Sequence, residues 1–178
     1  MEVNTNELPK NSEHWACIDG FKNYQVSWWG RVRNSKTGRI LKNSLSGNTY
    51  LTVSLCKMGK AKSFTVHVLV ARTWIKNPDE KRCVDHIDGD KKNNHYENLR
   101  WATHSENSRN QKTRTNKSSI YKGVYLHKSR NKWMARIDVD SKQMFLGYFE
   151  VEREAAEAYN AAALEHYKKF ARLNKFND

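Results

Sequence analysis

Residues 84–103, which read VDHIDGDKKNNHYENLRWAT, decide the fold of the middle of the chain. Apolar residues at both ends flank a turn-rich loop, Asp88 to Asn94, so we predict two short strands joined by that loop. Thr103 and Glu106 form the pattern of a capping box, in which each side chain bonds a free amide of the first helical turn. We therefore predict a strand, a loop, a second strand and a helix from about His104 to Lys112.

Four polar side chains in and after this stretch form the candidate site: Asp85, His86, Asn98 and Asn107. A carboxylate from Asp85 and an amide oxygen from Asn107 are hard donors that suit Mg²⁺ or Mn²⁺. An ion with only two protein ligands keeps positions for water and phosphate oxygens, which favours phosphodiester hydrolysis. His86 can take a proton from the attacking water, and Asn98 can tie the loop to the backbone that presents His86.

The order Asp85-His86 imposes a condition on this site. Neighbours in a regular strand point to opposite faces, so both can flank one phosphate only where the strand bends or ends. The Asp88-Gly89 turn predicts that end. The alternative is an aspartate in a polar loop beside a hydrogen-bonded histidine.

The chain is strongly basic, with 32 Lys and Arg residues against 19 Asp and Glu residues and a net charge of +13. Residues 117–149 hold seven basic residues against only Asp138 and Asp140. An excess of one sign on this scale is typical of proteins that bind a polyanion, so we expect a nucleic acid as the partner. The mean hydropathy of −0.93 predicts small cores under a polar surface.

Several classes of protein fit the sequence poorly. The longest apolar stretch, residues 64–71, is far shorter than the roughly 18 residues that a membrane span needs. The polar start, residues 1–7, predicts no secretory signal and a cytoplasmic location. An RNA-binding protein would carry the aromatic motifs of an RRM or the GXXG loop of a KH module. The cysteines, which we predict to be buried free thiols, form neither a disulfide framework nor a zinc motif: Cys17, Cys56 and Cys83.

The segments before the central stretch predict a small module. Residues 15–55 alternate short β-like runs with turns, which indicates an antiparallel meander. Residues 64–74 fit a buried strand or a helix, and their apolar spacing favours the helix. We predict that His67 is a hydrogen-bonded core histidine and that Trp28-Trp29 closes the core.

The C-terminal part predicts three strands, at 121–127, 132–139 and 143–149, followed by a helix rich in Ala and Tyr. Alternation directs Trp133, Ala135 and Ile137 toward that helix and leaves the intervening residues, Lys132, Met134 and Arg136, on the outer face.

The central stretch, residues 84–103 continued to Asn107, resembles the HNH nuclease motif in the variant whose third position is Asn, typical of phage homing endonucleases. The resemblance implies a ββα-metal fold with Asp85 and Asn107 as metal ligands. It also implies that His86 is the general base and Asn98 a structural asparagine. Upstream, residues 15–32 resemble the β module that often precedes this nuclease, and 64–71 its helical connector.

Residues 120–178 resemble the APETALA2-type DNA-binding domain of plant transcription factors, which is also fused to phage HNH nucleases. In that family a three-stranded sheet lies in the major groove. The plant proteins carry arginines where Tyr125, His127 and Asp138 stand here, so their base specificity does not transfer. The residues that we expect to face DNA are Lys122, Tyr125, His127, Arg130, Lys132, Arg136, Gln143, Phe145, Arg100 and Arg114.

These observations predict a modular α+β chain: an N-terminal β module (14–63), an HNH nuclease core with its preceding helix (64–112), a basic linker (113–119) and a three-stranded antiparallel sheet packed on one helix (120–178). We expect a monomer that binds double-stranded DNA, has no membrane contact and nicks one strand at a preferred site with Mg²⁺ or Mn²⁺. The alternative is a DNA-binding regulator that retains an inactive HNH core. The complete set of Asp85, His86, Asn98 and Asn107 favours the nuclease.

Overall fold

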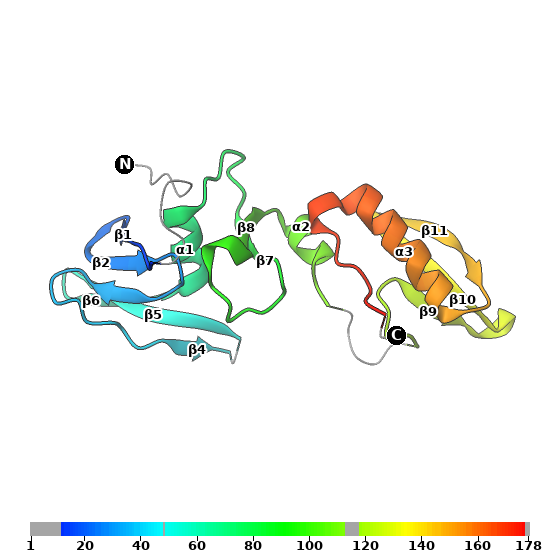
Figure 1. Cartoon of the computed structure of the whole chain (residues 1–178), viewed down its shortest axis with the longest axis horizontal. Helices are drawn as coiled ribbons and strands as arrows, with labels where there is room; N and C mark the ends of the chain where they lie inside the picture. Colours follow the sequence, from blue (N-terminus) through cyan, green and yellow to red (C-terminus); the bar gives the residue numbers. More distant parts are fainter. Residues whose placement is uncertain (1–11, 48, 113–117, 177–178) are drawn as a thin grey trace. The chain divides into compact units, whose positions relative to one another are not determined.

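The computed structural model describes residues 12–47, 49–112 and 118–176 (Figure 1). Backbone contacts divide the chain into two compact units, with the boundary between His104 and Ser105. Each unit has its own hydrophobic core. The architecture is α+β, with several small antiparallel sheets and few helices, as predicted.

The first unit contains two three-stranded antiparallel sheets, a helix and a β-hairpin. Its elements are β1 (Trp15–Ile18), β2 (Phe21–Ser27), β3 (Val32–Asn34), β4 (Ser44–Ser46), β5 (Tyr50–Lys57), β6 (Lys60–Thr65), α1 (Val66–Trp74), β7 (Cys83–His86), the 3₁₀ turn η2 (Tyr96–Asn98) and β8 (Leu99–Ala102). The helical prediction for residues 64–74 is confirmed, except that the first two residues end β6. The two strands around the central loop are confirmed as β7 and β8.

One core joins both three-stranded sheets to α1 and β8. Val26, Leu55, Val70 and Leu99 are all buried in this cluster, although they come from β2, β5, α1 and β8. The predicted boundary between residues 63 and 64 therefore runs through a shared core. Burial of these side chains fixes the hairpin of β7 and β8 against the rest of the unit.

Two sequence predictions for the first unit need correction. Of the tryptophan pair, Trp28 is buried but Trp29 is exposed, because the turn after β2 directs only Trp28 into the core. The cysteines are free but are not buried: Cys17 and Cys56 are exposed and Cys83 is intermediate. Cys17 and Cys56 occupy outward positions of β1 and β5, where alternation brings Ile18 and Leu55 into the core instead.

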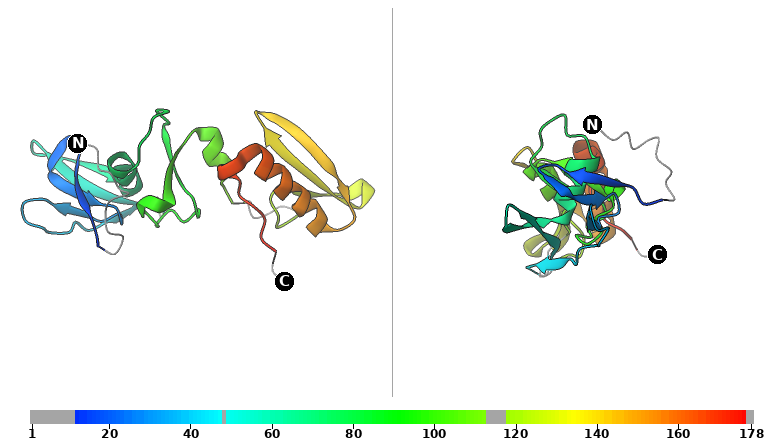
Figure 2. Two further views of the ribbon diagram at one scale, coloured as in Figure 1. Left: turned by 45° about the horizontal axis from the view of Figure 1, so that its top comes forward. Right: turned by 90° about the vertical axis from the view of Figure 1, so that its left-hand side faces the viewer.

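The second unit contains a short helix and a three-stranded sheet covered by a long helix. Its elements are α2 (His104–Arg109), β9 (Val124–His127), the 3₁₀ turn η3 (Lys128–Arg130), β10 (Lys132–Val139), β11 (Lys142–Phe149), α3 (Glu152–Tyr167) and the 3₁₀ turn η4 (Lys168–Phe170). The sheet is antiparallel with the order β11-β10-β9. Figures 1 and 2 show α3 lying along one face of it.

Small side chains allow close contact between α3 and the sheet. Ala155 and Ala156 pack with Ala135, and Tyr159 packs with Ile137. The predicted inward alternation of β10 is confirmed, since Ala135 and Ile137 are buried and Trp133 packs against the same cluster. The opposite face of the sheet therefore carries the outward side chains. Among the residues that the structure describes, no helix is long and apolar enough to cross a membrane.

Candidate active site

Asp85 lies in β7, directly opposite Arg100 of β8. Its side chain is only 5% exposed, and its Oδ2 accepts hydrogen bonds from Arg100 Nε at 2.8 Å and Arg100 NH2 at 2.7 Å. A buried carboxylate needs such compensation, because desolvation of an unpaired charge is costly. We predicted that Arg100 faces DNA, but its guanidinium is bound to the carboxylate of Asp85.

His86 ends β7 and is buried. Its Nε2 lies 3.1 Å from Oδ1 of Asn94, which is also buried and lies in the loop after β7. An amide oxygen only accepts hydrogen bonds, so this contact places a proton on Nε2, and in the neutral imidazole the acceptor is then Nδ1. Asn94 thereby sets both the orientation and the tautomer of the imidazole.

Asn98 holds the loop between the two strands of the hairpin. Its Nδ2 donates to Asp88 Oδ1 at 3.0 Å and to the Asn93 carbonyl at 2.8 Å, and its Oδ1 accepts from the Asp88 amide at 3.1 Å. Burial alone would raise the pKa of the Asp88 carboxyl, but hydrogen bonds from Asn93, the Asp90 amide and Asn98 lower it below its ordinary value. Asn98 therefore ties this loop to the backbone that presents His86.

The turn between β2 and β3 braces the same loop from outside. Tyr96 stacks on Trp28 with ring centroids 5.2 Å apart, and its amide donates to the Trp28 carbonyl at 2.8 Å. Gly30 has a φ of +84°, and a Cβ there would lie 2.7 Å from the Cβ of Asn94. Only glycine allows this approach, so the turn keeps Asn94 against His86.

A second histidine and a tyrosine lie beside the imidazole of His86. The ring of His67, from α1, lies 5.1 Å from that of His86, and the ring of Tyr50 lies 4.8 Å from that of His67. His67 is buried, but its Nδ1 has no hydrogen-bond partner among the described residues, so the predicted satisfied histidine is wrong at this atom. Burial, joined by the charge of His86, lowers the pKa of His67 to about 4. The ammonium of Lys91 lies 4.9 Å from the centre of the Tyr50 ring.

Asn107 lies on α2 in the second unit and is half-buried. The oxygens of Asp85 and Asn107 are hard donors, which Mg²⁺ and Mn²⁺ prefer, so each side chain is a suitable type of ligand for such an ion. Within residues 12–47, 49–112 and 118–176 no cluster of three or more His, Cys, Asp and Glu side chains could hold a metal.

The outer face of the sheet in the second unit groups aromatic and cationic side chains. The guanidinium carbon of Arg136 lies 4.1 Å from the centre of the Tyr125 ring, and Arg136 NH1 donates to Gln143 Oε1 at 2.9 Å. Tyr148 is the centre of a second group. Its ring lies 5.2 Å from His127, 5.0 Å from Phe145 and 4.9 Å from the guanidinium carbon of Arg130.

Two further DNA-facing candidates make contacts within the protein. Lys132 Nζ lies 2.7 Å from Oε1 of Glu150. Lys122 Nζ donates to the carbonyls of Arg109 and Gln111. Arg114 lies outside the residues that the structure describes.

Comparison with known proteins places these features in a family. A model of the HNH endonuclease matches residues 75–109, and a model of the NUMOD4 motif matches residues 13–56. The solved structure of the HNH homing endonuclease I-HmuI, a protein that binds and cleaves DNA, is 30% identical. The match covers 87% of this chain and 91% of that chain with a TM-score of 0.53. The chain belongs to the HNH endonuclease family.

Curated proteins of the HNH type agree with this assignment. The DNA endonuclease I-HmuI of Bacillus phage SP01 is 43% identical over 101 residues, which cover 56% of this chain and 58% of that protein. An uncharacterized HNH endonuclease, L245 of Acanthamoeba polyphaga mimivirus, is 44% identical over 94 residues, which cover 53% of this chain and 28% of the relative. The chain thus spans less than two thirds of the length of these relatives.

Similarity to APETALA2-type proteins is narrower than the HNH match. The AP2-like ethylene-responsive transcription factor AIL7 of Arabidopsis thaliana is 46% identical over 50 residues, which cover 27% of this chain and 10% of that protein. The observed three-stranded sheet and helix agree with the expected architecture, and the domain assignment itself stays a prediction.

Sequence reasoning missed several residues around the HNH motif. Asn94 stands beside Asn93 in the loop, and the sequence holds no signal for which amide turns inward toward His86. Tyr50 and Lys91 come close to the histidine pair only through the fold. Tyr148 could have been found, because it precedes the inward-facing Phe149 in β11, and alternation turns it to the outer face.

Proposed function

We propose that this chain is a divalent-metal-dependent DNA endonuclease that hydrolyses one phosphodiester bond at a preferred site. The observation that carries the proposal is His86, a buried imidazole oriented by Asn94 and adjacent to the buried carboxylate of Asp85. A general base needs a lone pair held in a fixed direction, and the hydrogen bond from Nε2 leaves that lone pair on Nδ1.

His86 takes a proton from the water that attacks the phosphorus. Asn94 keeps the proton on Nε2, so the base stays in the tautomer that can accept. Asn98 holds the loop after β7, and with it the position of Asn94 and His86 relative to each other. The rings of His67 and Tyr50 limit the space into which the imidazole can turn.

Asp85 and Asn107 are the side chains that would hold the ion. A bound Mg²⁺ or Mn²⁺ supplies positive charge at the phosphate and at the leaving oxygen. Arg100 binds Oδ2 of Asp85, which orients the carboxylate at its place in β7. With one set of Asp85, His86 and Asn107, the chain addresses one scissile phosphate at a time.

The sheet of the second unit is the proposed reading surface, in line with an APETALA2-type domain. Its outer face offers Arg136 and Gln143 as hydrogen-bonding groups and Phe145 as an exposed aromatic side chain. Arginine and glutamine are the side chains that read guanine and adenine edges in the major groove. The cation–π contact with Tyr125 restrains the guanidinium before it meets DNA.

Cleavage of duplex DNA by the full chain tests the proposal. The wild type is incubated with a library of random duplexes in Mg²⁺ and, in parallel, in EDTA, and the cut positions are mapped. We expect cuts at a preferred sequence only with Mg²⁺. His86→Ala should lose about 100- to 10,000-fold in rate, the usual contribution of a general base, while its affinity for the same duplex stays the same.

The alternative is an HNH core that binds DNA without cutting it. Sequence-preferring binding by the wild type with no Mg²⁺-dependent cuts would favour that regulator and overturn the endonuclease. Equal cleavage by wild type and His86→Ala would instead reject His86 as the base.

Supercoiled plasmid distinguishes a nick from a double-strand cut. A monomer with one site should convert plasmid that carries the target to open circles, which accumulate at limiting enzyme. Concerted appearance of linear DNA would contradict the nickase and indicate a symmetric dimer, since antiparallel strands need two oppositely oriented sites.

A further inference from the structure

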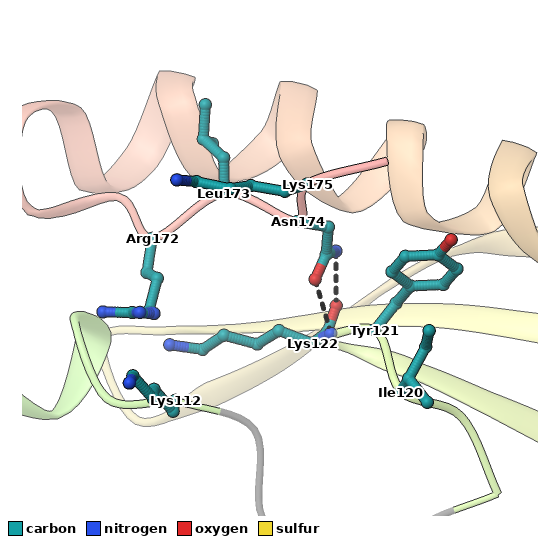
Figure 3. Close-up of a pocket in the computed structure, with 8 residues that line it drawn as sticks. All are labelled: Lys112, Ile120, Tyr121, Lys122, Arg172, Leu173, Asn174 and Lys175. Atoms are coloured by element: carbon teal, nitrogen blue, oxygen red, sulfur yellow. Dashed lines mark hydrogen bonds between the residues drawn. The ribbon is translucent and has the colours of Figure 1, made fainter. Parts of the chain in front are cut away.

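A hollow of about 290 Å³ lies in the second unit, away from the outer face of the sheet (Figure 3). It lies between Lys112, which follows α2, the segment that leads into β9, and the chain after η4. The residues that line it are Lys112, Ile120, Tyr121, Lys122, Arg172, Leu173, Asn174 and Lys175. Four of these eight are cations and none is an acid.

Two of the cations donate to backbone carbonyls. Arg172 NH1 donates to the Asn110 carbonyl at 3.3 Å, and Lys122 Nζ donates to the Gln111 carbonyl at 2.9 Å. Carbonyl groups orient a cation without cancelling its charge. A guanidinium has five N–H donors, so Arg172 keeps donors for a ligand.

The other two cations lie at the surface. Lys112 and Lys175 are exposed, and no carboxylate among the described residues forms an ion pair with Lys112, Arg172 or Lys175. In Figure 3 the ends of Lys112, Lys122 and Arg172 extend to the same side of the hollow. Lys112, Arg172 and Lys175, like charges with no acid among the residues that line the hollow, attract an anion.

The back wall of the hollow is rigid. The Asn174 side chain accepts from the Lys122 amide at 2.6 Å and donates to the Lys122 carbonyl at 3.1 Å. Asn160 of α3 forms a second reciprocal pair with the Asn174 backbone, at 2.7 and 3.0 Å. Asn174 therefore joins the backbone of Lys122, just before β9, to α3, so this wall is ordered before a ligand binds.

Apolar side chains form part of the rim. Ile120 is 80% exposed and Leu173 is 40% exposed, so both offer apolar surface at the rim. A phosphate diester joins an anion to the apolar edge of a sugar, and it matches this combination better than a carboxylate or a bare inorganic ion does.

We propose that this hollow binds a backbone phosphate of duplex DNA. The proposal rests on the proposed function, because it takes DNA as the partner of the chain. The contact is made to the backbone, so it adds affinity and register without adding sequence preference. It would supplement the sheet with a second point of attachment.

The test is the salt dependence of duplex binding by the full chain, measured by fluorescence anisotropy on random-sequence DNA. The variant is Lys112→Ala/Lys175→Ala, because both side chains are exposed and neither forms an ion pair among the described residues. Loss of one phosphate contact should reduce the slope of log K against log salt by about 0.9, with an equal loss of affinity on every sequence. The control is Arg153→Ala/Lys169→Ala, which removes the same charge from exposed positions outside the hollow and should leave the slope unchanged.

Three results would overturn the proposal. A slope for the hollow variant equal to that of the wild type would show that no phosphate binds there. An equal change of the slope in the control variant would show that the effect depends on net charge and not on the hollow. Calorimetric binding of inorganic phosphate that the variant abolishes, with an unchanged DNA slope, would make the hollow a site for a free anion. If the wild type itself bound no DNA, the proposed function would fall first, and this contact with it.

Discussion

Acidification should unfold the first unit through His67. The imidazole is 8% exposed, faces the rings of Tyr50 and His86, and has an Nδ1 atom without a hydrogen-bond partner among the described residues. Burial and then the charge of His86 lower its pKa from 6.5 to about 4. The folded unit therefore holds His67 neutral at pH values where the unfolded chain already takes up a proton.

The sign and size of the effect follow from this difference. Between pH 6.5 and about 4 the unfolded state binds more protons at His67, so the free energy of unfolding falls as the pH falls. At about 1.4 kcal/mol per pH unit the full loss is about 3.5 kcal/mol, and about 2.5 kcal/mol of it is reached by pH 4.5. Asp88, whose pKa is lowered, adds a loss of the same sign only at more acidic pH.

Urea unfolding followed by tryptophan fluorescence measures this loss in the full chain. Of the six tryptophans, only Trp133 lies in the second unit, so the signal reports mainly the first. The matched variant is His67→Phe, which keeps an aromatic ring and does not titrate. We expect the wild type to lose about 2.5 kcal/mol more than the variant between pH 7.5 and pH 4.5. Parallel pH curves for the two proteins would refute the reasoning.

Substitutions at Asn94 and at Gly123 test two other contacts. Asn94→Asp places a carboxylate against the imidazole of His86, which stabilises its protonated form, so the pH below which cleavage declines should rise by about one unit. Asn94→Ala should lower the cleavage rate without that rise. Identical pH profiles for the two variants would argue against the hydrogen bond between Asn94 and His86. Gly123→Ala should destabilise the second unit by roughly 1–3 kcal/mol in thermal melts followed by circular dichroism, because its φ is +78° and a Cβ would collide with the Tyr159 ring. Gly38→Ala, at a φ of +71° with open space around it, is the control for backbone strain alone and should cost less.

Local chemistry was sufficient to predict the hairpin and the loop. The turn residues Asp88-Gly89 end β7 where the sequence required an end, and Asn98 makes the three hydrogen bonds that hold the loop. Alternation in β10 was equally readable, because Ala135 and Ile137 pack on a helix that follows in the chain. Such features depend on residues near one another in sequence.

Contacts between distant residues could not be read from the pattern. Asn94 turns inward because Gly30, far upstream, allows the backbones to meet. Lys122 and Arg100 carry charges that suited DNA, but the fold places their ends on internal carbonyls and on Asp85. The orphaned Nδ1 of His67 likewise depends on how α1 meets the hairpin.

The central claim is that cleavage by this chain depends on an ion held at Asp85, and a Mn²⁺ titration of duplex cleavage tests it most directly. Asp85→Asn is the preferred variant, because it keeps the shape beside Arg100, whereas removal of the whole side chain would leave a partly buried guanidinium unpaired. With folding verified by circular dichroism, the variant should need at least about tenfold more Mn²⁺ than the wild type for half-maximal cleavage, or should not cleave at all. Coincident titration curves for wild type and Asp85→Asn, or wild-type cleavage that persists in EDTA, would contradict the account.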